Sequence, residues 1–195
     1  VTLTEEGRVK KTNPNIYLDF NAIGKGHAVD VISSMMENQF GYSNTLVEIG
    51  GELHAKGKHI LKNSQWTVAI DTPNLNEDER ELLRILKLEN QALATSGNYR
   101  KYRIDDAGNK VVHTINPLNG TARPSKVLSA SVVAADCMTA DAYATALMSM
   151  PLSMLEEQSI EGVEYMLIFA GEDGAYDLRL SPKFPSLNLP FYKQE

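Results

Sequence analysis

Two short segments of this 195-residue sequence carry residue types that can bind a nucleotide phosphate and a metal ion. The first segment reads Asp19-Phe-Asn-Ala-Ile-Gly-Lys-Gly26. Its two glycines let a ligand approach the backbone, Lys25 adds a positive charge, and a helix starting nearby would present unpaired amides to a phosphate. Asp19 could accept hydrogen bonds from a ribose or a base edge. The spacing matches neither Gly-x-Gly-x-x-Gly nor a P-loop, so a solvated Lys25 and a helix-capping Asp19 stay open as alternatives.

The second segment, residues 139–150, places Asp141 and Thr145 four residues apart and therefore on one face of a predicted helix. A carboxylate and a hydroxyl are hard oxygen ligands, and Mg²⁺ takes one or two carboxylates together with substrate phosphates and waters. An acidic protein that binds a diphosphate gains most from such a metal. The alternative is an acidic residue in the first turn of a helix, where the helix dipole favours it.

Two other places could touch a ligand. His113 stands at the end of a predicted strand, three residues before Asn116, and could act as a general base or contact a flavin. A structural histidine in a strand is the alternative. Residues 95–99 form a turn of small residues that ends in an aromatic and could lie against a planar ring, which makes Ser96 and Gly97 candidate cofactor contacts. A tight turn with a packed tyrosine explains the same pattern.

The elements that must position these residues follow from the periodicity of the chain. We predict a strand at residues 15–20, a glycine-rich turn, and a helix from residue 28 to residue 40. A second helix should run from Thr139, as its N-cap, to Met150, where Pro151 stops it. The remaining predicted elements are strands at 44–49, 66–70, 93–104, 110–115, 128–134, 165–169 and 175–180, a short helix at 153–159, and a loop or surface helix near 76–84. Many hairpin signals and few helices indicate an α+β fold with a largely antiparallel sheet.

Composition limits the classes of function. The length and an apolar content of 43% predict one soluble domain over residues 1–195. A net charge of −6 argues against a nucleic-acid partner and implies that any phosphate site is local. The single cysteine, Cys137, excludes an intramolecular disulfide. No apolar run is long enough for a membrane span.

Read together, these segments resemble the ApbE family, the FAD:protein FMN transferases. The resemblance runs from about residue 19 to residue 150. Five collinear segments carry it: Asp19-x-x-Ala22-x-x-Lys25-Gly26, Val47-Glu-Ile-Gly-Gly-Glu52, Ala94-Thr-Ser-Gly-Asn-Tyr99, His113-x-x-x-Pro117-x-x-Gly120 and Ala140-Asp141-Ala-x-Ala-Thr145-Ala146. It implies an α+β fold related to the T-fold, with helices packed on the sheet. It also implies a Mg²⁺-dependent enzyme that cleaves FAD, attaches FMN to a Thr or Ser of a target flavoprotein and releases AMP.

The resemblance also implies roles for individual residues. Asp19 and Lys25 match FAD contacts of the family, and the amides near Gly26 are expected to take the remaining phosphate charge. The metal ligands are expected to be Asp141, Thr145 and, through its backbone carbonyl, Ala22. His113 matches a histidine implicated in activity, as the base for the acceptor hydroxyl.

The chain resembles roughly the last two-thirds of such a protein and lacks the N-terminal region that helps to form the flavin pocket. Asn119 stands where the family usually has Thr. Hydrolysis of FAD to FMN and AMP, and FAD binding without catalysis, remain alternatives to transfer. Family members are commonly periplasmic lipoproteins of the inner membrane. By resemblance, a membrane contact would therefore come only through a lipid anchor absent from this chain.

Overall fold

The computed structural model describes most of the 195-residue chain: residues 1–73, 81–98, 102–104, 106, 108, 110–112, 115, 120–122, 127–150, 160–171 and 175–185. Its helices are α1 (Asn21–Asn38), α2 (Cys137–Ser149) and a short 3-10 helix, η1 (Ile60–Lys62). Its strands are β1 (Thr2–Leu3), β2 (Val9–Lys10), β3 (Thr45–Ile49), β4 (Glu52–Lys56), β5 (Trp66–Asp71), β6 (Leu82–Leu88), β7 (Gln91–Gly97), β8 (Tyr102–Ile104), β9 (Lys110–Val112), β10 (Val127–Ala134), β11 (Glu164–Ala170) and β12 (Tyr176–Leu180).

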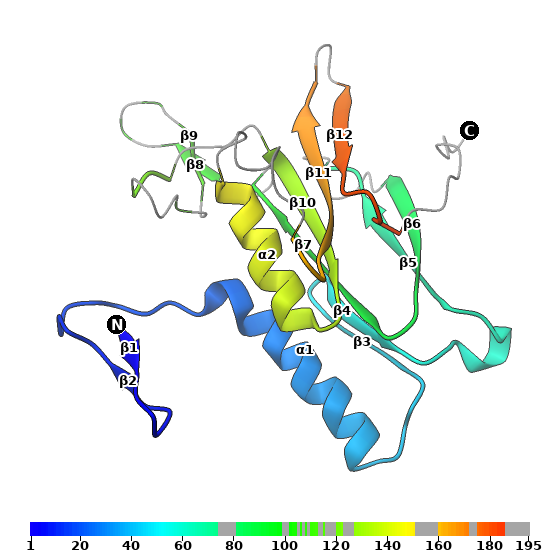
Figure 1. Cartoon of the computed structure of the whole chain (residues 1–195). Coiled ribbons are helices and arrows are strands. Elements are labelled where there is room, and N and C mark those ends of the chain that lie inside the picture. The colour runs from blue at the N-terminus through cyan, green and yellow to red at the C-terminus, as the bar shows by residue number, and fades with distance from the viewer. Residues whose placement is uncertain are drawn as a thin grey trace.

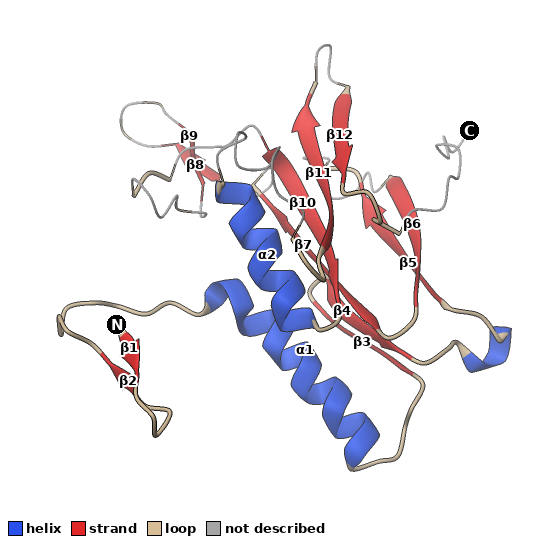
Figure 2. Cartoon of the chain, viewed as in Figure 1, coloured by secondary structure: helices blue, strands red, loops and turns tan. Residues whose placement is uncertain are grey.

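A six-stranded antiparallel sheet forms the centre of the molecule, in the order β12-β11-β10-β7-β4-β3 (Figure 2). Strand β10 lies between β7 and β11, and its Ala130 pairs with Ser96 on one side and Leu167 on the other. Short hairpins β1-β2, β5-β6 and β8-β9 complete the strand pairs of the described residues. The predicted α+β fold with a largely antiparallel sheet is confirmed.

Different layers cover the two faces of this sheet. Helices α1 and α2 lie against one face, and the β5-β6 hairpin packs on the other (Figure 1). The alternation of side chains along each strand separates two cores: Val132 packs under α2, whereas the next residue, Val133, packs against the hairpin. Neither α1 nor α2 combines the length and the apolar character needed to cross a membrane.

The structure corrects the predicted start of both helices. Residues 15–20 are not a strand, and α1 begins at Asn21, so Gly24 and Gly26 lie within its first two turns and not in a loop before it. Helix α2 is capped by Asp136, whose Oδ1 accepts the Thr139 N–H at 2.8 Å, so Thr139 is not the N-cap. A helix start needs its acceptor before the first free amides, and Asp136 supplies it three residues earlier than the predicted N-cap.

Other predicted elements are close to those observed. The hairpins around residue 106 and residue 173 are present as β8-β9 and β11-β12. The long strand predicted at 93–104 is two strands, β7 and β8, and the segment near 76–84 includes the start of β6. The short helix predicted at 153–159 lies outside the described residues.

Helices α1 and α2 touch backbone to backbone at Gly26. A Cβ atom at this position would lie 2.3 Å from the carbonyl oxygen of Cys137 and 2.8 Å from Cβ of Asp141. Both distances are far below van der Waals contact, and the neighbour on α2 is main chain that cannot move aside. Gly26 therefore sets how closely the two helices approach.

We expect Gly26→Ala to lower the free energy of unfolding by about 2 kcal/mol or more, because the added methyl must push α2 away. The matched control is Gly24→Ala in the same helix. Gly24 is exposed, and a Cβ there meets nothing within 4 Å, so this change should raise stability by about 0.5–1 kcal/mol. Urea unfolding of the two variants measures the difference. Equal effects would contradict the packing role of Gly26.

Candidate active site

Asp141 of α2 reaches the backbone of α1. Its Oδ2 accepts a hydrogen bond from the Gly26 N–H at 2.9 Å, and the side chain is only 3% exposed. In an α-helix that N–H points toward the carbonyl of Ala22, four residues earlier. The structure thus brings Asp141 against the α1 backbone at Gly26, about one helix turn after Ala22. Asp141 and Ala22 are two of the three residues predicted to hold a metal.

Thr145, the third predicted metal ligand, lies one turn after Asp141 on α2. Its Oγ1 is 3.2 Å from the Oγ of Ser96, which projects from β7 under the helix. Ser96 and the next residue, Gly97, were predicted to contact the cofactor. The structure places Ser96 beside Thr145, so a predicted cofactor residue and a predicted metal ligand meet at the end of β7.

Lys25 forms an ion pair with Glu52, which ends one of the five matched segments but was given no role in the predicted site. Its Nζ lies 2.5 Å from Oε2 of Glu52, which is 2% exposed at the start of β4. Lys25 itself remains about half exposed. The signal for Glu52 was a charged residue directly after Gly50-Gly51, but only the ion pair with Lys25 shows that its side chain lies against α1.

Glu52, Asp141 and Lys25 act on one another electrostatically. Burial raises the pKa of Glu52, and the Asp141 charge raises it further, while Lys25 lowers it by hydrogen bonding and by charge. Burial also raises the pKa of Asp141, against the lowering effects of the Gly26 amide and Lys25. Two buried carboxylates therefore share one ammonium group. The negative charge of the two carboxylates favours binding of a further cation, and the half-exposed Lys25 can form an ion pair with an anionic ligand.

Asp19 lies at the start of α1, where its Oδ1 accepts the Asn21 N–H at 2.7 Å. Its Oδ2 is 3.2 Å from the Asn21 side-chain amide, and the residue is exposed. Asp19 therefore accepts the first amide of α1 from the position before the N-cap, Phe20, as the capping alternative expected. Its predicted contact with FAD stays a prediction, as does that of Gly26, whose amide is engaged with Asp141. His113, the predicted base, lies outside the described residues.

Asp30 is a second residue that the sequence analysis missed. From α1 it accepts hydrogen bonds from the first two amides of α2, those of Cys137 and Met138, at 2.9 and 2.8 Å. His54 of β4 contacts the same carboxylate. No local pattern could have found this group, because its members are far apart in the sequence.

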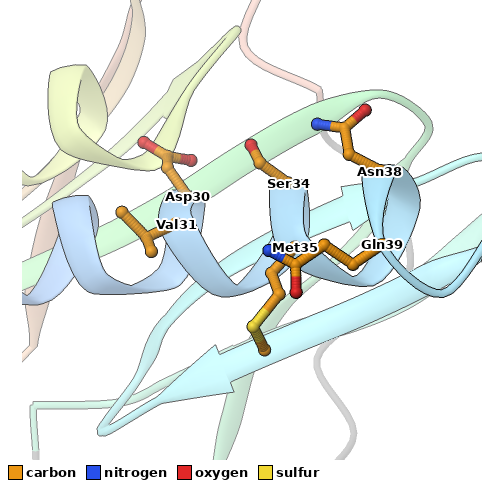
Figure 3. Close-up of a pocket in the computed structure, with 6 residues that line it drawn as sticks. All are labelled: Asp30, Val31, Ser34, Met35, Asn38 and Gln39. Carbon is orange, nitrogen blue, oxygen red and sulfur yellow. The ribbon is translucent and has the colours of Figure 1, made fainter.

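An open hollow of about 420 Å³ runs along α1 and is lined by Asp30, Val31, Ser34, Met35, Asn38 and Gln39 (Figure 3). Only Asp30 among them belongs to the polar contacts described above. The hollow includes none of the residues predicted to bind FAD or metal, so it is separate from the candidate site. Across the described ranges, no three His, Cys, Asp or Glu side chains gather closely enough to hold a metal by themselves.

Comparison with known proteins gives a consistent result. The model of the ApbE family matches residues 1–167. The chain is 40% identical over 149 residues to a FAD:protein FMN transferase of Vibrio cholerae serotype O1, covering 76% of this chain and 43% of that protein. It is 31% identical over 179 residues to the Escherichia coli K12 protein of the same name, covering 91% and 49%.

Solved structures agree with the sequence comparison. The flavin transferase ApbE from Vibrio cholerae superposes with a TM-score of 0.71 at 31% identity, covering 88% of this chain and 52% of that one. The apo form of the Pseudomonas stutzeri flavinyl transferase ApbE gives a TM-score of 0.70 at 29% identity, covering 86% and 50%. The chain thus spans about half the length of the relatives it matches.

The Glu52–Lys25 pair should respond unequally to loss of either partner. Lys25→Met leaves a buried carboxylate without its counter-charge and should cost about 1–3 kcal/mol at pH 7. Glu52→Gln removes the charge that burial disfavours and leaves a lysine that water can solvate. We expect this variant to be at least as stable as the wild type at pH 7.

The pH dependence follows from the raised pKa of Glu52. A carboxyl with a higher pKa in the folded state binds more protons there, so its contribution to stability falls as pH rises above 4.5 through the folded pKa. The cost of Lys25→Met should therefore shrink between pH 7 and pH 4. Urea unfolding at both pH values tests this. A cost independent of pH would contradict an electrostatic role for the pair.

Proposed function

This chain belongs to the ApbE family, and we propose that the protein containing it transfers the FMN half of FAD to a Thr or Ser hydroxyl of an acceptor flavoprotein and releases AMP. One observation carries the proposal. The buried Asp141 carboxylate meets the α1 backbone beside Lys25, in a chain whose relatives bear the name FAD:protein FMN transferase. The proposal treats residues 1–195 as a single domain.

The residues around Asp141 fit a Mg²⁺ ion. Burial disfavours the charged carboxylate, and within the described part of the chain only one hydrogen bond, from Gly26, reaches it. Thr145 and the Ala22 carbonyl would add two more hard oxygen donors, which is the ligand type that Mg²⁺ requires. When bound, Mg²⁺ would neutralise the charge of the FAD diphosphate. The remaining positions would be left to phosphate and water, since among the described residues no three His, Cys, Asp or Glu side chains gather closely enough to form a cage.

The other residues would orient FAD and its acceptor. Lys25 projects from the first turns of α1 and would hold a phosphate oxygen, while Asp19, Ser96 and Gly97 would contact the rest of FAD. The acceptor oxygen then bonds to the FMN phosphorus, and the bond from that phosphorus to the bridging oxygen breaks. AMP leaves with the electron pair of that bond. The acceptor proton would pass to His113. Transfer of this kind depends mainly on positioning and charge neutralisation.

The metal assignment can be tested in the full-length protein that carries this chain. With FAD, Mg²⁺ and an acceptor protein bearing a reactive Thr, we expect covalent FMN on the acceptor and an equal amount of AMP. Asp141→Ala should reduce transfer about 100-fold or more, whereas Asp177→Ala, on the exposed edge strand β12, should leave it unchanged.

The products discriminate the proposal from its alternatives. AMP and free FMN in the presence of acceptor would mean that water is the true acceptor and the protein is a hydrolase. Bound FAD without AMP would make it a binding protein. Full transfer by the Asp141→Ala variant would refute the metal site.

His113 should affect the chemical step and not the binding of FAD. We expect His113→Asn to lower the transfer rate about 100-fold or more at neutral pH, the usual contribution of a general base. The dissociation constant of FAD, followed by flavin fluorescence, should change little. A transfer rate that recovers as the pH is raised would support proton removal, because hydroxide then replaces the missing base. An unchanged rate at pH 7 would exclude His113 as the base.

A location on the periplasmic side of the inner membrane, held there by a lipid anchor outside this chain, is part of the proposal. It is supported only by resemblance to family members. The sequence upstream of residue 1 in the parent protein tests it, because a lipoprotein signal must stand there if the location is right.

A further inference from the structure

Two carboxylate contacts join α1 and α2, and each helix contributes one of the carboxylates. Asp141 of α2 accepts the Gly26 amide of α1. One turn further along α1, Asp30 accepts the amides of Cys137 and Met138 at the start of α2. Residues 26 and 30 are four apart on one helix and residues 137 and 141 are four apart on the other. The two contacts therefore lie on matching faces and reinforce the same alignment.

The Asp30 side chain is held on its other side by the sheet. The Nδ1 atom of His54 lies 2.8 Å from Asp30 Oδ1, and the two side chains are only 10% and 20% exposed. An ionised carboxylate can only accept hydrogen bonds, so the histidine ring donates here. With three donors on two oxygens, Asp30 links α1, α2 and β4 at one point.

Asp30 is not needed merely to cap α2, because that helix has its own cap. Asp136 accepts the Thr139 N–H at 2.8 Å and the Thr139 hydroxyl at 2.9 Å. The contacts of Asp136 stay within one helix turn, whereas those of Asp30 cross between helices that are more than 100 residues apart in the sequence. Asp30 therefore sets where α2 lies relative to α1.

We propose that Asp30 is a positioning residue for the metal site, which holds Asp141 and Thr145 of α2 at the proper distance from the Ala22 carbonyl of α1. This inference rests on the proposed function, since the ligands come from both helices. Mg²⁺ requires close to octahedral geometry with short bonds, so a small shift of one helix separates its ligands. Residues that orient metal ligands are commonly worth 10–100-fold in metal affinity.

The test compares two Asp→Asn substitutions, at Asp30 of α1 and at Asp136 before α2, because both carboxylates accept amides at the start of α2. Asp30→Asn removes the charge that spans the helices, and Asp136→Asn removes the charge that caps α2 locally. The readout is the dissociation constant of Mn²⁺, followed by electron paramagnetic resonance of the free ion. It is measured on the full-length protein, alone and with ADP as a source of diphosphate. Mn²⁺ suits the purpose because it accepts the same oxygen ligands as Mg²⁺.

We expect Asp30→Asn to weaken Mn²⁺ binding about tenfold or more and Asp136→Asn to weaken it less than about twofold, although each variant replaces a carboxylate at the same helix end, because Asn also serves as an N-cap. Urea unfolding shows whether the two variants lose similar stability. Asp30→Glu provides a second variant if Asp30→Asn does not fold. It keeps the charge and both acceptor oxygens, but its extra methylene displaces α2, so Mn²⁺ binding should still weaken severalfold.

The outcomes separate this inference from the proposed function. If Asp141→Ala abolishes Mn²⁺ binding while both Asp30 variants bind like the wild type, or like Asp136→Asn, the positioning role is wrong and the metal site stands. If Asp141→Ala binds Mn²⁺ like the wild type, the metal site is wrong and the inference falls with it.

Discussion

The close approach of α1 and α2 at Gly26 is the constraint on which the candidate site depends. The carbonyl of Cys137 occupies the space that any larger side chain would need, so the two backbones touch. Only at this separation can Asp141 accept an amide hydrogen from α1. The same contact sets Lys25, the residue before Gly26 on α1, above the sheet where Glu52 lies. The glycine therefore acts on the site through packing and not through flexibility.

The site combines groups that are unfavourable for folding. Glu52 and Asp141 are nearly inaccessible to water, and burial raises the pKa of both. Lys25 partly offsets the two charges but is itself half exposed. A protein gains no stability from such an arrangement, because pairing in the interior seldom exceeds the cost of desolvation. Buried carboxylates whose pKa values are raised in this way are typical of functional sites.

Local patterns predicted part of this arrangement. The four-residue spacing of Asp141 and Thr145 indicated one helix face, and both side chains do lie on the inner side of α2, toward α1 and β7. The hairpin signals between the predicted strands, with few helices, were sufficient to predict the antiparallel sheet. The glycines near Lys25 were wrongly predicted to form a turn, because glycine disfavours a helix. Only the close contact between Gly26 and α2 shows why a glycine stands inside α1.

The missed residues share a physical reason. Glu52 and Asp30 acquire their roles only when β4 and α2 are brought against α1, and nothing within ten residues of either indicates the partner. Asp136 was missed as the N-cap because the apolar pattern of α2 indicates the middle of the helix and does not fix its first residue. His113 lies outside the described residues, so its prediction rests on resemblance alone.

The matched four-residue spacings on α1 and α2 limit where the chain can tolerate an inserted residue. One residue inserted between Gly26 and Asp30, or between Cys137 and Asp141, turns everything beyond it by about 100° around the helix axis. If one of the two contacts were kept, the other would then face away from the partner helix. Surface loops of the fold can lengthen without this penalty. Among related proteins, these two intervals should therefore keep constant length even where the residues inside them differ.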